Sequence, residues 1–571
     1  MHRSAGLFGA ISAFLLIVFF LADFWLSEDS FITFRVLDNF WNGHGLRWNI
    51  SERVQVFTHP LWMVILLSIY PSGFLFFGVL ALSLALWLGT SYNLLYFVFK
   101  RGEPRDTFLG FLLLCMILSS RFFLDYSSSG LETPLSYFLL SYWWTVREKI
   151  SRFQNPKHVI ERGILSSLLL LTRYDLILWI LPDWIRYFKS VFREKNIPKY
   201  EYYRIFLFST IGFLPFFFWF FFSWIYFGSP FPNTYFAKTN ISHSLLEKIQ
   251  SGLSLIKVSI LWDPVLILPM FAYLLISGIR RKLEDPSLIL VSSFLHLGYL
   301  FYVGGDFMAG RFLTPFFLGS LFLLKDELFK KQNGFVGLAS PLEKGVLFFS
   351  FLFLLFVQIF SSYATWRSFV PSMERPLQLK DGVVDERASY RNHTSIRAFL
   401  SDNGPDKHPW ALWGKKSVLR KTGEEIRFTT NVGLAGYYGG PNLHLVDELA
   451  LTDPFLSRLP GRGFPGHYLR LVPKGYKEVI SEVRDNLEDA DLDRFLYETR
   501  LLSEGELFTW ERCLVSFSFL FTRNGNYKSR LGNRSYSFDM SLFRETIYGL
   551  PFKNFSDQKV IIEQNKYYFS N

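Results

Sequence analysis

Cysteine is scarce in this sequence, with only two among 571 residues. Cys115 lies inside a predicted membrane span and Cys513 lies far along the C-terminal region, so a disulfide between them is not expected. Two thiols are also too few for a cysteine-based metal cluster.

The sequence also lacks the short motifs of common soluble enzymes. It contains no phosphate-binding P-loop, no HExxH pair, no GxSxG nucleophile and no glycine fingerprint after a strand. Nucleotide chemistry on the cytoplasmic side is therefore not expected. Internal repeats are missing as well, which argues against a transporter built from two repeated halves.

Apolar and aromatic residues are abundant instead. Half of the residues are hydrophobic, with 65 Phe and 16 Trp, and the mean hydropathy is +0.20. Runs that could cross a bilayer are 7–26, 73–98, 107–122, 134–147, 162–188, 205–227, 264–279, 287–303, 312–325 and 344–364. The run 162–188 is interrupted by Arg-Tyr-Asp at 173–175, so about eleven passages are predicted. The fold class is therefore a polytopic α-helical membrane protein.

The first apolar run could be read as a signal peptide. Its flank, LADFWLSED, has no clear small-x-small cleavage site, and many further spans follow it. A retained first helix is therefore expected.

The position of the basic residues matters more than the net charge of +11. Lys and Arg cluster in short segments between the apolar runs, which indicates cytoplasmic loops. The positive charge therefore reports the topology, and a nucleic-acid partner is not expected. With the N-terminus inside, the remaining loops all face outward. These loops are 27–59, 121–134, 172–175, 226–238 and 304–311.

This topology divides the chain into two parts. Residues 1–365 form a membrane module whose first outer loop is 27–60, and residues 366–571 form an extracytoplasmic α/β domain. Within that domain, 426–440 and 442–449 resemble short strands and turns, whereas 477–499 has the acidic spacing of an exposed helix.

Glu28 and Asp29 form an acidic pair directly after the first span. Acids at a helix end are often only solvated flanks, but Arg35, Asp38 and the segment around His59 join this pair. A carboxylate near a low-dielectric boundary can have its pKa raised enough to accept a proton from a hydroxyl.

Two further outer loops supply cations. In GGDFMAGRF, Asp306 and Arg311 either form an internal pair or provide a flexible loop whose arginine binds a phosphate. In PNTYFAK, Lys238 either extends to lipid headgroups or neutralises a lipid phosphate.

Charges also occur within or beside apolar runs. Arg173 and Asp175 interrupt a span, where a charge indicates either function or an internal pair. Glu132 precedes Thr133 and Pro134, an arrangement typical of a helix N-terminus.

An outward pocket with carboxylates and several cations is suited to group transfer from a lipid-phosphate carrier, with the lipid tail between helices.

A set of segments resembles the GT-C superfamily of membrane glycosyltransferases, and in particular relatives of the mycobacterial terminal β-(1,2)-arabinofuranosyltransferase. The segments lie in consistent order from residue 28 to about 475. They are EDSFITFRVLDNFWNGHGLRWN (28–49), THPLW (58–62), SGLETPL (129–135), LTRYD (171–175), GSPFPNTYFAK (228–238), GGDFMAGRFLTP (304–315), GLAGYYGG (433–440), LVDELALTDPFLSRLP (445–460) and PGHY (465–468).

The resemblance implies inverting transfer of a sugar from a polyprenyl-phosphate donor to a cell-envelope glycan or glycolipid acceptor at the outer face of the cell inner membrane. The family usually has Asp-Asp at positions 28 and 29, and this sequence departs from that pattern at the first of them. The general base is therefore placed on Asp29, with Glu28 as a helper. Candidate phosphate ligands are Arg311, Lys238 and Arg173, although TRYD departs from the usual Arg-Pro-Asp or Arg-Pro-Glu. Supporting residues are Arg35, His59, Glu132, Asp175, Asn233 and Asp306.

Two alternatives remain open. The same chemistry could act on lipid A, a lipopolysaccharide core or a protein, or the pocket could carry a lipid-linked sugar without making a bond. No cofactor is required by the predicted mechanism, although Glu28, Asp29 and Asp306 could hold Mg²⁺.

Overall fold

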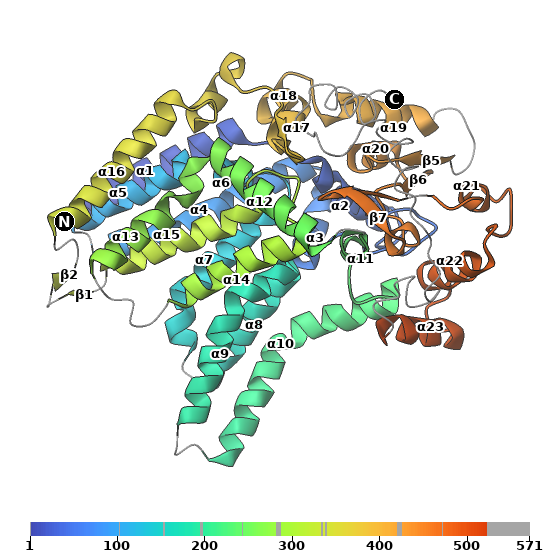
Figure 1. The fold of residues 1–571 in the computed structure, drawn as a ribbon, viewed down its shortest axis with the longest axis horizontal. Helices are drawn as coiled ribbons and strands as arrows, with labels where there is room; N and C mark the ends of the chain where they lie inside the picture. The colour runs from blue at the N-terminus through green and yellow to red at the C-terminus, as the bar shows by residue number, and fades with distance from the viewer. Residues whose placement is uncertain are drawn as a thin grey trace.

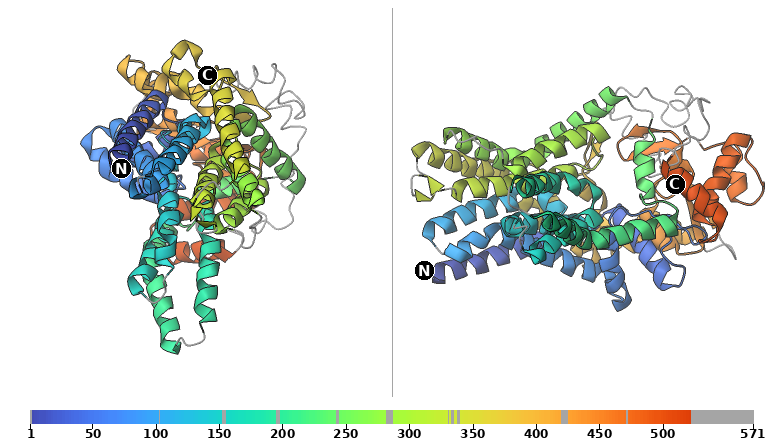
Figure 2. Two further views of the ribbon diagram at one scale, coloured as in Figure 1. Left: turned by 90° about the vertical axis from the view of Figure 1, so that its left-hand side faces the viewer. Right: turned by 90° about the horizontal axis from the view of Figure 1, so that it is seen from below.

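The computed structural model in Figures 1 and 2 is mostly helical. It describes residues 2–521, except for 102, 152–154, 195–197, 242–243, 281–286, 330, 333–334, 337–339, 419–424 and 471.

Helices account for almost all of the described chain up to residue 360. They are α1 (His2–Asp23), α2 (Glu28–Trp41), α3 (Pro60–Ile69), α4 (Leu75–Arg101), α5 (Pro104–Ser119), α6 (Arg121–Asp125), α7 (Thr133–Ile150), α8 (Pro156–Thr172), α9 (Ile177–Arg193), α10 (Lys199–Phe227), α11 (Asn233–Thr239), α12 (Leu245–Trp262), α13 (Leu268–Ile279), α14 (Leu288–Val303), α15 (Thr314–Phe329) and α16 (Pro341–Phe360). Short 3-10 turns are η1 (Tyr70–Ser72), η2 (Tyr174–Leu176), η3 (Pro264–Ile267) and η4 (Arg311–Leu313), and one hairpin is β1 (Lys331–Gln332) with β2 (Phe335–Val336).

Several of these helices could cross a membrane, and the protein is therefore membrane-associated. Within the described residues, four helices are long and apolar enough: Gly6–Asp23, Leu75–Lys100, Lys199–Phe227 and Pro341–Phe369. The pair Leu245–Trp262 and Pro264–Ile279, bent by 107°, would be a fifth span if it counts as one passage. By length and composition, the described helices thus supply fewer than the eleven predicted passages.

Part of the shortfall has a physical reason in helix length. Asp106–Ser119 and Leu288–Val303, which lie in the predicted runs 107–122 and 287–303, are apolar but have only 10–17 residues, as has Pro60–Ser72, where no passage was predicted. At about 1.5 Å per residue they extend about 15–26 Å, less than the roughly 30 Å hydrocarbon core. The predicted interruption at 173–175 is confirmed, because η2 separates α8 from α9.

Helices α8 and α10 approach each other unusually closely. A Cβ atom on Gly163 would lie 2.7 Å from the Gly212 Cα, and the Ser167 hydroxyl donates a hydrogen bond of 2.9 Å to the Gly212 carbonyl. Small residues allow such backbone contact between membrane helices.

The chain after residue 360 combines short helices with two-stranded sheets. Its helices are α17 (Glu386–Thr394), α18 (Ile396–Leu400), α19 (Pro409–Val418), α20 (Gly433–Gly439), α21 (Tyr476–Ile480), α22 (Ala490–Ser503) and α23 (Trp510–Phe521), with 3-10 turns η5 (Thr365–Phe369), η6 (Pro371–Met373), η7 (Pro405–Lys407) and η8 (Leu456–Arg458). The antiparallel sheets are β3 (Leu379–Lys380) with β4 (Val383–Val384) and β7 (Gly461–Phe464) with β8 (His467–Arg470), and β5 (Glu425–Thr429) pairs in parallel with β6 (Leu443–Asp447).

We call residues 366–521 the outer segment, because the sequence predicts that they lie outside the membrane. The elements predicted for this segment are partly correct. Strands β5 and β6 occupy the predicted regions, but the glycine-rich GLAGYYG forms helix α20. The single helix expected over 477–499 is wrong, because α21 ends at Ile480 and α22 begins at Ala490.

Two hydrophobic cores run through the molecule. The larger core includes side chains from α1 onward and continues to Leu434, Leu443 and Leu445. The smaller core begins at Val446 and extends to Phe519. The first half of the outer segment therefore packs directly on the helical part (Figure 1).

A buried ion cluster joins the same two parts. Arg121 contacts Asp23 at 2.8 Å and Asp125 at 2.9 Å. From the outer segment, Arg387 contacts Asp23 at 3.3 Å and Arg375 contacts Asp125 at 3.3 Å. All five side chains are almost inaccessible to solvent, so each charge requires its partners.

Candidate functional site

Asp29 lies in the first turn of α2, where an acidic side chain is favoured by the helix dipole. The start of this helix is fixed by the Ser27 amide, which donates a hydrogen bond of 2.8 Å to the Ser129 carbonyl. The Asp29 residue is partly exposed and has no hydrogen bond or ion pair to any described residue. Its carboxyl group is therefore free to contact a ligand.

The electrostatic surroundings of Asp29 favour its protonated form. Burial raises its pKa above the usual range, Arg311 and Lys238 lower it, and Asp306 and Glu132 raise it again. The net direction is upward, which makes Asp29 a better proton acceptor than an ordinary surface aspartate.

Glu28 has a different environment although it is the adjacent residue. Its Oε1 atom accepts a hydrogen bond of 3.1 Å from the Leu434 amide at the start of α20. A Cβ atom on Gly433 would lie 2.2 Å from the Glu28 carbonyl oxygen, so α20 packs tightly here. Burial, and then Asp29, raise the pKa of Glu28 to about 8. Glu28 thus connects α2 to the outer segment.

Glu132 is the centre of a buried ion network. Its Oε1 atom accepts hydrogen bonds from Arg173 at 3.0 Å and Arg311 at 3.1 Å, and its Oε2 atom lies 3.2 Å from His59 Nδ1. Burial alone would raise the pKa of Glu132, but Arg311, His59 and Arg173 hold it well below the usual range. Glu132 is therefore ionised and orients both arginines.

The network extends in two directions from Glu132. The His59 Nε2 atom lies 2.9 Å from the Thr33 hydroxyl on α2. Arg173 makes a bidentate contact with Asp175, at 2.9 and 3.0 Å. Residues from four of the predicted outer loops therefore meet at one place.

The two arginines differ in their capacity for a further ligand. All three guanidinium nitrogens of Arg173 donate to Asp175 or Glu132. In Arg311, Nη2 donates to Glu132, Nη1 contacts the Met308 sulfur at 3.3 Å, and Nε has no hydrogen-bond partner. Since a thioether is a weak acceptor, Arg311 has more donor capacity left than Arg173.

Asp306 lies in the loop between α14 and η4. Its Oδ1 atom accepts a hydrogen bond of 2.9 Å from the Phe307 amide, whereas its buried Oδ2 atom has no hydrogen-bond partner. The loop is fixed by Val384, whose amide donates to the Phe307 carbonyl at 2.7 Å. Gly310, with a φ of +72°, lies where a Cβ atom would be 2.3 Å from the Phe122 ring.

Lys238 is an exposed residue in the last turn of α11, and it has no hydrogen bond or ion pair to a described residue. It lies close enough to lower the pKa of Asp29. Its helix is held in place by Asn233, whose Nδ2 atom donates to the carbonyls of Ala450, Leu451 and Asp453 at 3.0–3.1 Å. Asn233 therefore positions α11 and does not face the Asp29 region with a free group.

Arg35 is also occupied by contacts within the protein. Its Nη2 atom donates a hydrogen bond of 2.5 Å to the Leu443 carbonyl, and its guanidinium lies 4.4 Å from the centre of the Trp48 ring. These contacts attach α2 to β6, in agreement with a supporting role.

Glu386, the first residue of α17, is a member of this group that the sequence did not indicate. It is buried, and burial, followed by Asp29, Glu28 and Asp306, raises its pKa well above the usual range. Its local sequence, VVDERASY, carries no motif, so only the fold brings it close to Asp29.

The carboxylates do not form a metal site. Among the described residues, no three His, Cys, Asp or Glu side chains are grouped closely enough to hold an ion. Glu28, one of the three ligands considered for Mg²⁺, is bound to the Leu434 amide. The residues therefore do not fit a bound Mg²⁺.

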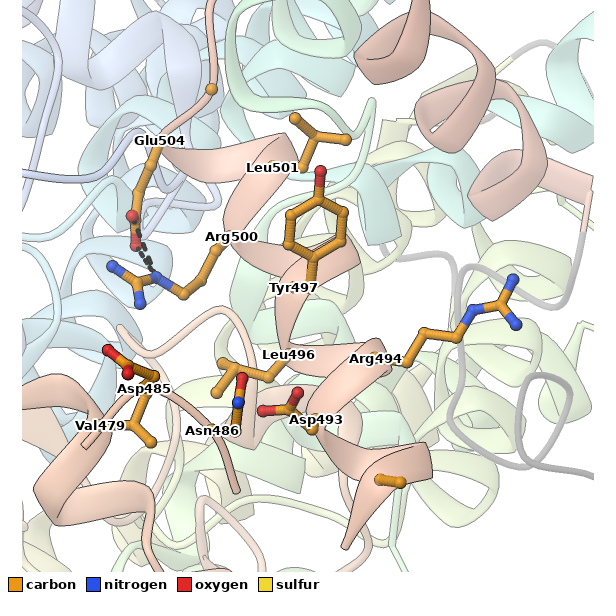
Figure 3. A pocket seen from close by; sticks show the side chains of 12 residues that line it. Val479, Asp485, Asn486, Asp493, Arg494, Leu496, Tyr497, Arg500, Leu501 and Glu504 are labelled. Carbon is orange, nitrogen blue, oxygen red and sulfur yellow. Dashed lines mark hydrogen bonds and ion pairs between the residues drawn. The ribbon is translucent and has the colours of Figure 1, made fainter. Parts of the chain in front are cut away.

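A separate cavity of about 720 Å³ lies on the outer segment between α21 and α22. Figure 3 shows Asp485, Asn486 and Asp493 on its wall and the ion pair of Arg500 with Glu504 at 2.9 Å. None of the predicted site residues lines this cavity.

Comparisons of the sequence with known protein families and with curated proteins found no match.

Proposed function

We propose that the protein is a membrane glycosyltransferase of the GT-C type. It transfers a sugar, such as arabinofuranose or another pentose, from a polyprenyl-phosphate donor to a glycan or glycolipid acceptor. The reaction takes place at the outer face of the cytoplasmic membrane. The observation that carries this proposal is the Asp29 carboxyl group, which has no hydrogen bond or ion pair to a described residue and lies in the field of Arg311 and Lys238.

Each group has a distinct role in the proposed reaction. The acceptor hydroxyl oxygen attacks the anomeric carbon while Asp29 takes the hydroxyl proton. The bond between the anomeric carbon and the phosphate oxygen breaks, and its electron pair leaves with the polyprenyl phosphate. Displacement from the opposite face inverts the configuration of the sugar.

The cations stabilise the leaving group. Among the described residues, the Arg311 Nε donor and the Lys238 ammonium have no hydrogen-bond partner, so both can contact a phosphate. Arg173 already donates three hydrogen bonds to Asp175 and Glu132 and holds both carboxylates in place. Because a phosphate is a good leaving group, no separate general acid is required.

The decisive experiment compares three substitutions of a carboxyl by an amide in purified protein. With a radiolabelled polyprenyl-phosphate pentose and a glycan acceptor, Asp29→Asn should reduce kcat about 10²–10⁴-fold because the general base is lost. Glu28→Gln and Glu386→Gln are matched controls and should stay within a few-fold of the unaltered protein, since neither carboxyl takes the proton.

Two outcomes would contradict the proposal. Retained transfer by Asp29→Asn would remove Asp29 from the role of base. Movement of the lipid-linked sugar across a vesicle membrane, without any transfer by the unaltered protein, would instead identify a transporter.

A further inference from the structure

Helix α23 carries a stripe of exposed apolar side chains. Trp510, Leu514, Phe517 and Phe521 are 77%, 53%, 54% and 70% exposed, respectively. Their spacing of four, three and four residues places them on one face of the helix. We call these four residues the α23 stripe.

The buried face of α23 is attached to the end of α10. The Arg512 guanidinium donates to the carbonyls of Ile225 at 2.8 Å and Tyr226 at 3.2 Å, and the Ser516 hydroxyl donates to the Gly228 carbonyl at 3.2 Å. Figure 1 shows α23 beside this end of α10. The position of α23 along the molecule is therefore set by the end of a candidate membrane span.

The α23 stripe continues an apolar surface that begins on α10. Phe218, Phe221 and Ile225 are exposed large hydrophobic residues on the second half of α10. At the junction the Phe517 and Trp224 rings stack with their centres 6.4 Å apart. The exposed apolar side chains of α10 are thus joined to the α23 stripe through the contact of Trp224 with Phe517.

We propose that α23 is an interfacial helix that binds the outer leaflet of the lipid bilayer through the α23 stripe. Helix α23 presents Trp and Phe on one face, and its opposite face is held against the protein by Arg512 and Ser516, an arrangement suited to a helix that lies in the plane of the membrane interface. Trp510 at the start of the stripe, and Trp224, whose ring contacts Phe517, match the aromatic belt at bilayer interfaces.

This contact gives the outer segment a second attachment to the membrane. The N-terminal end of the outer segment follows the candidate span Pro341–Phe369. At its C-terminal end, α23 is held beside α10. The inference depends on membrane insertion of α10 and is independent of the proposed transferase reaction.

The native Cys513 provides a probe next to the stripe, because it is exposed and lies between Trp510 and Phe517. The full-length protein with Cys115→Ser, labelled at Cys513 with an environment-sensitive fluorophore, is placed in phospholipid nanodiscs. Quenching by lipids that carry a nitroxide near the headgroup is compared with quenching by aqueous iodide. The control is Val483→Cys, 78% exposed, in a Cys115→Ser and Cys513→Ser background.

We expect lipid nitroxides to quench the Cys513 probe at least threefold more than the Val483→Cys probe, with the reverse order for iodide. Equal quenching of both probes by iodide would overturn the proposal. Protection of Cys513 from both quenchers would also overturn it, since another protein surface, such as residues 522–571 or a second copy, would then cover the stripe. A Leu514→Cys probe in the same cysteine-free background repeats the measurement within the stripe.

Discussion

Lys238 differs from the arginines of the candidate site because its charge has no partner among the described residues. Replacement of a side chain without partners changes the free energy of unfolding by no more than about 0.5 kcal/mol. A charge-assisted contact with a phosphate contributes about 1.5–3 kcal/mol, which corresponds to roughly 10–100-fold in rate or affinity.

Lys238→Gln should therefore lower kcat/KM for the polyprenyl-phosphate donor about 10–100-fold while the melting temperature stays constant. Steady-state kinetics and thermal unfolding in detergent measure the two effects. The matched control is Lys474→Gln, at another exposed lysine, which should change neither quantity. Unchanged donor kinetics in Lys238→Gln would contradict a phosphate contact.

At the level of single residues, the sequence predicted most of the group around Glu132. Basic clusters alone predicted which loops share one side of the membrane, and from these loops His59, Glu132, Arg173, Asp175 and Arg311 form one network. Glu386 escaped prediction because its neighbours in space come from residues more than 70 positions away in the sequence. The pairing of Arg173 with both Asp175 and Glu132 also required coordinates.

Among the elements, the contact between α8 and α10 depends on two glycines. Any side chain on Gly163 would meet the backbone of Gly212, which is rigid. Gly163→Ile should therefore force the helices apart and lower the free energy of unfolding by about 1–3 kcal/mol or more. Thermal unfolding in detergent should show a lower melting temperature.

The matched control for this change is the same substitution at Gly298 in α14. An added Cβ atom there meets nothing within 4 Å, so Gly298→Ile should leave the melting temperature unchanged or slightly higher. Equal melting temperatures for both variants would show that the close contact between α8 and α10 contributes nothing to stability.

Long apolar helices were the easiest elements to predict, because hydropathy reports them directly. Helix α20 was missed since its three glycines within GLAGYYG disfavour a helix by about 1 kcal/mol each. Helix α20 forms because the Glu28 carboxylate accepts a hydrogen bond from the Leu434 amide and because α2 packs against α20. The interruption between α21 and α22 was also missed. Its sequence signal is Asp489, whose side chain caps α22 by accepting hydrogen bonds from the amides of Asp491 and Leu492.

For the whole molecule, buried carboxyl groups make stability depend on pH. Burial raises the pKa of Glu28 to about 8, with a further rise from Asp29, and burial raises the pKa values of Glu52 and Asp447 to about 7. The folded state therefore holds protons that the unfolded chain releases near pH 4. Folding stability is largest below the unfolded pKa values and falls as the pH rises toward 7–8.

The melting temperature in detergent should therefore decrease steadily from pH 5 to pH 8. Each group that stays protonated in the folded state contributes up to about 1.4 kcal/mol per pH unit in this window. Glu28→Gln should make the dependence less steep, since the amide needs no proton. A melting temperature that is constant or rises across this range would contradict the predicted direction.

The buried cluster of Asp23, Arg121, Asp125, Arg375 and Arg387 also affects how the protein is made. Before Arg375 and Arg387 have been synthesised, two aspartates share the single positive charge of Arg121. An uncompensated buried charge is strongly destabilising, so the N-terminal helices of a growing chain cannot settle into their final packing. This ion cluster is therefore complete only after nearly 390 residues have been translated, and chains that end earlier should be cleaved faster by membrane proteases than the full-length chain.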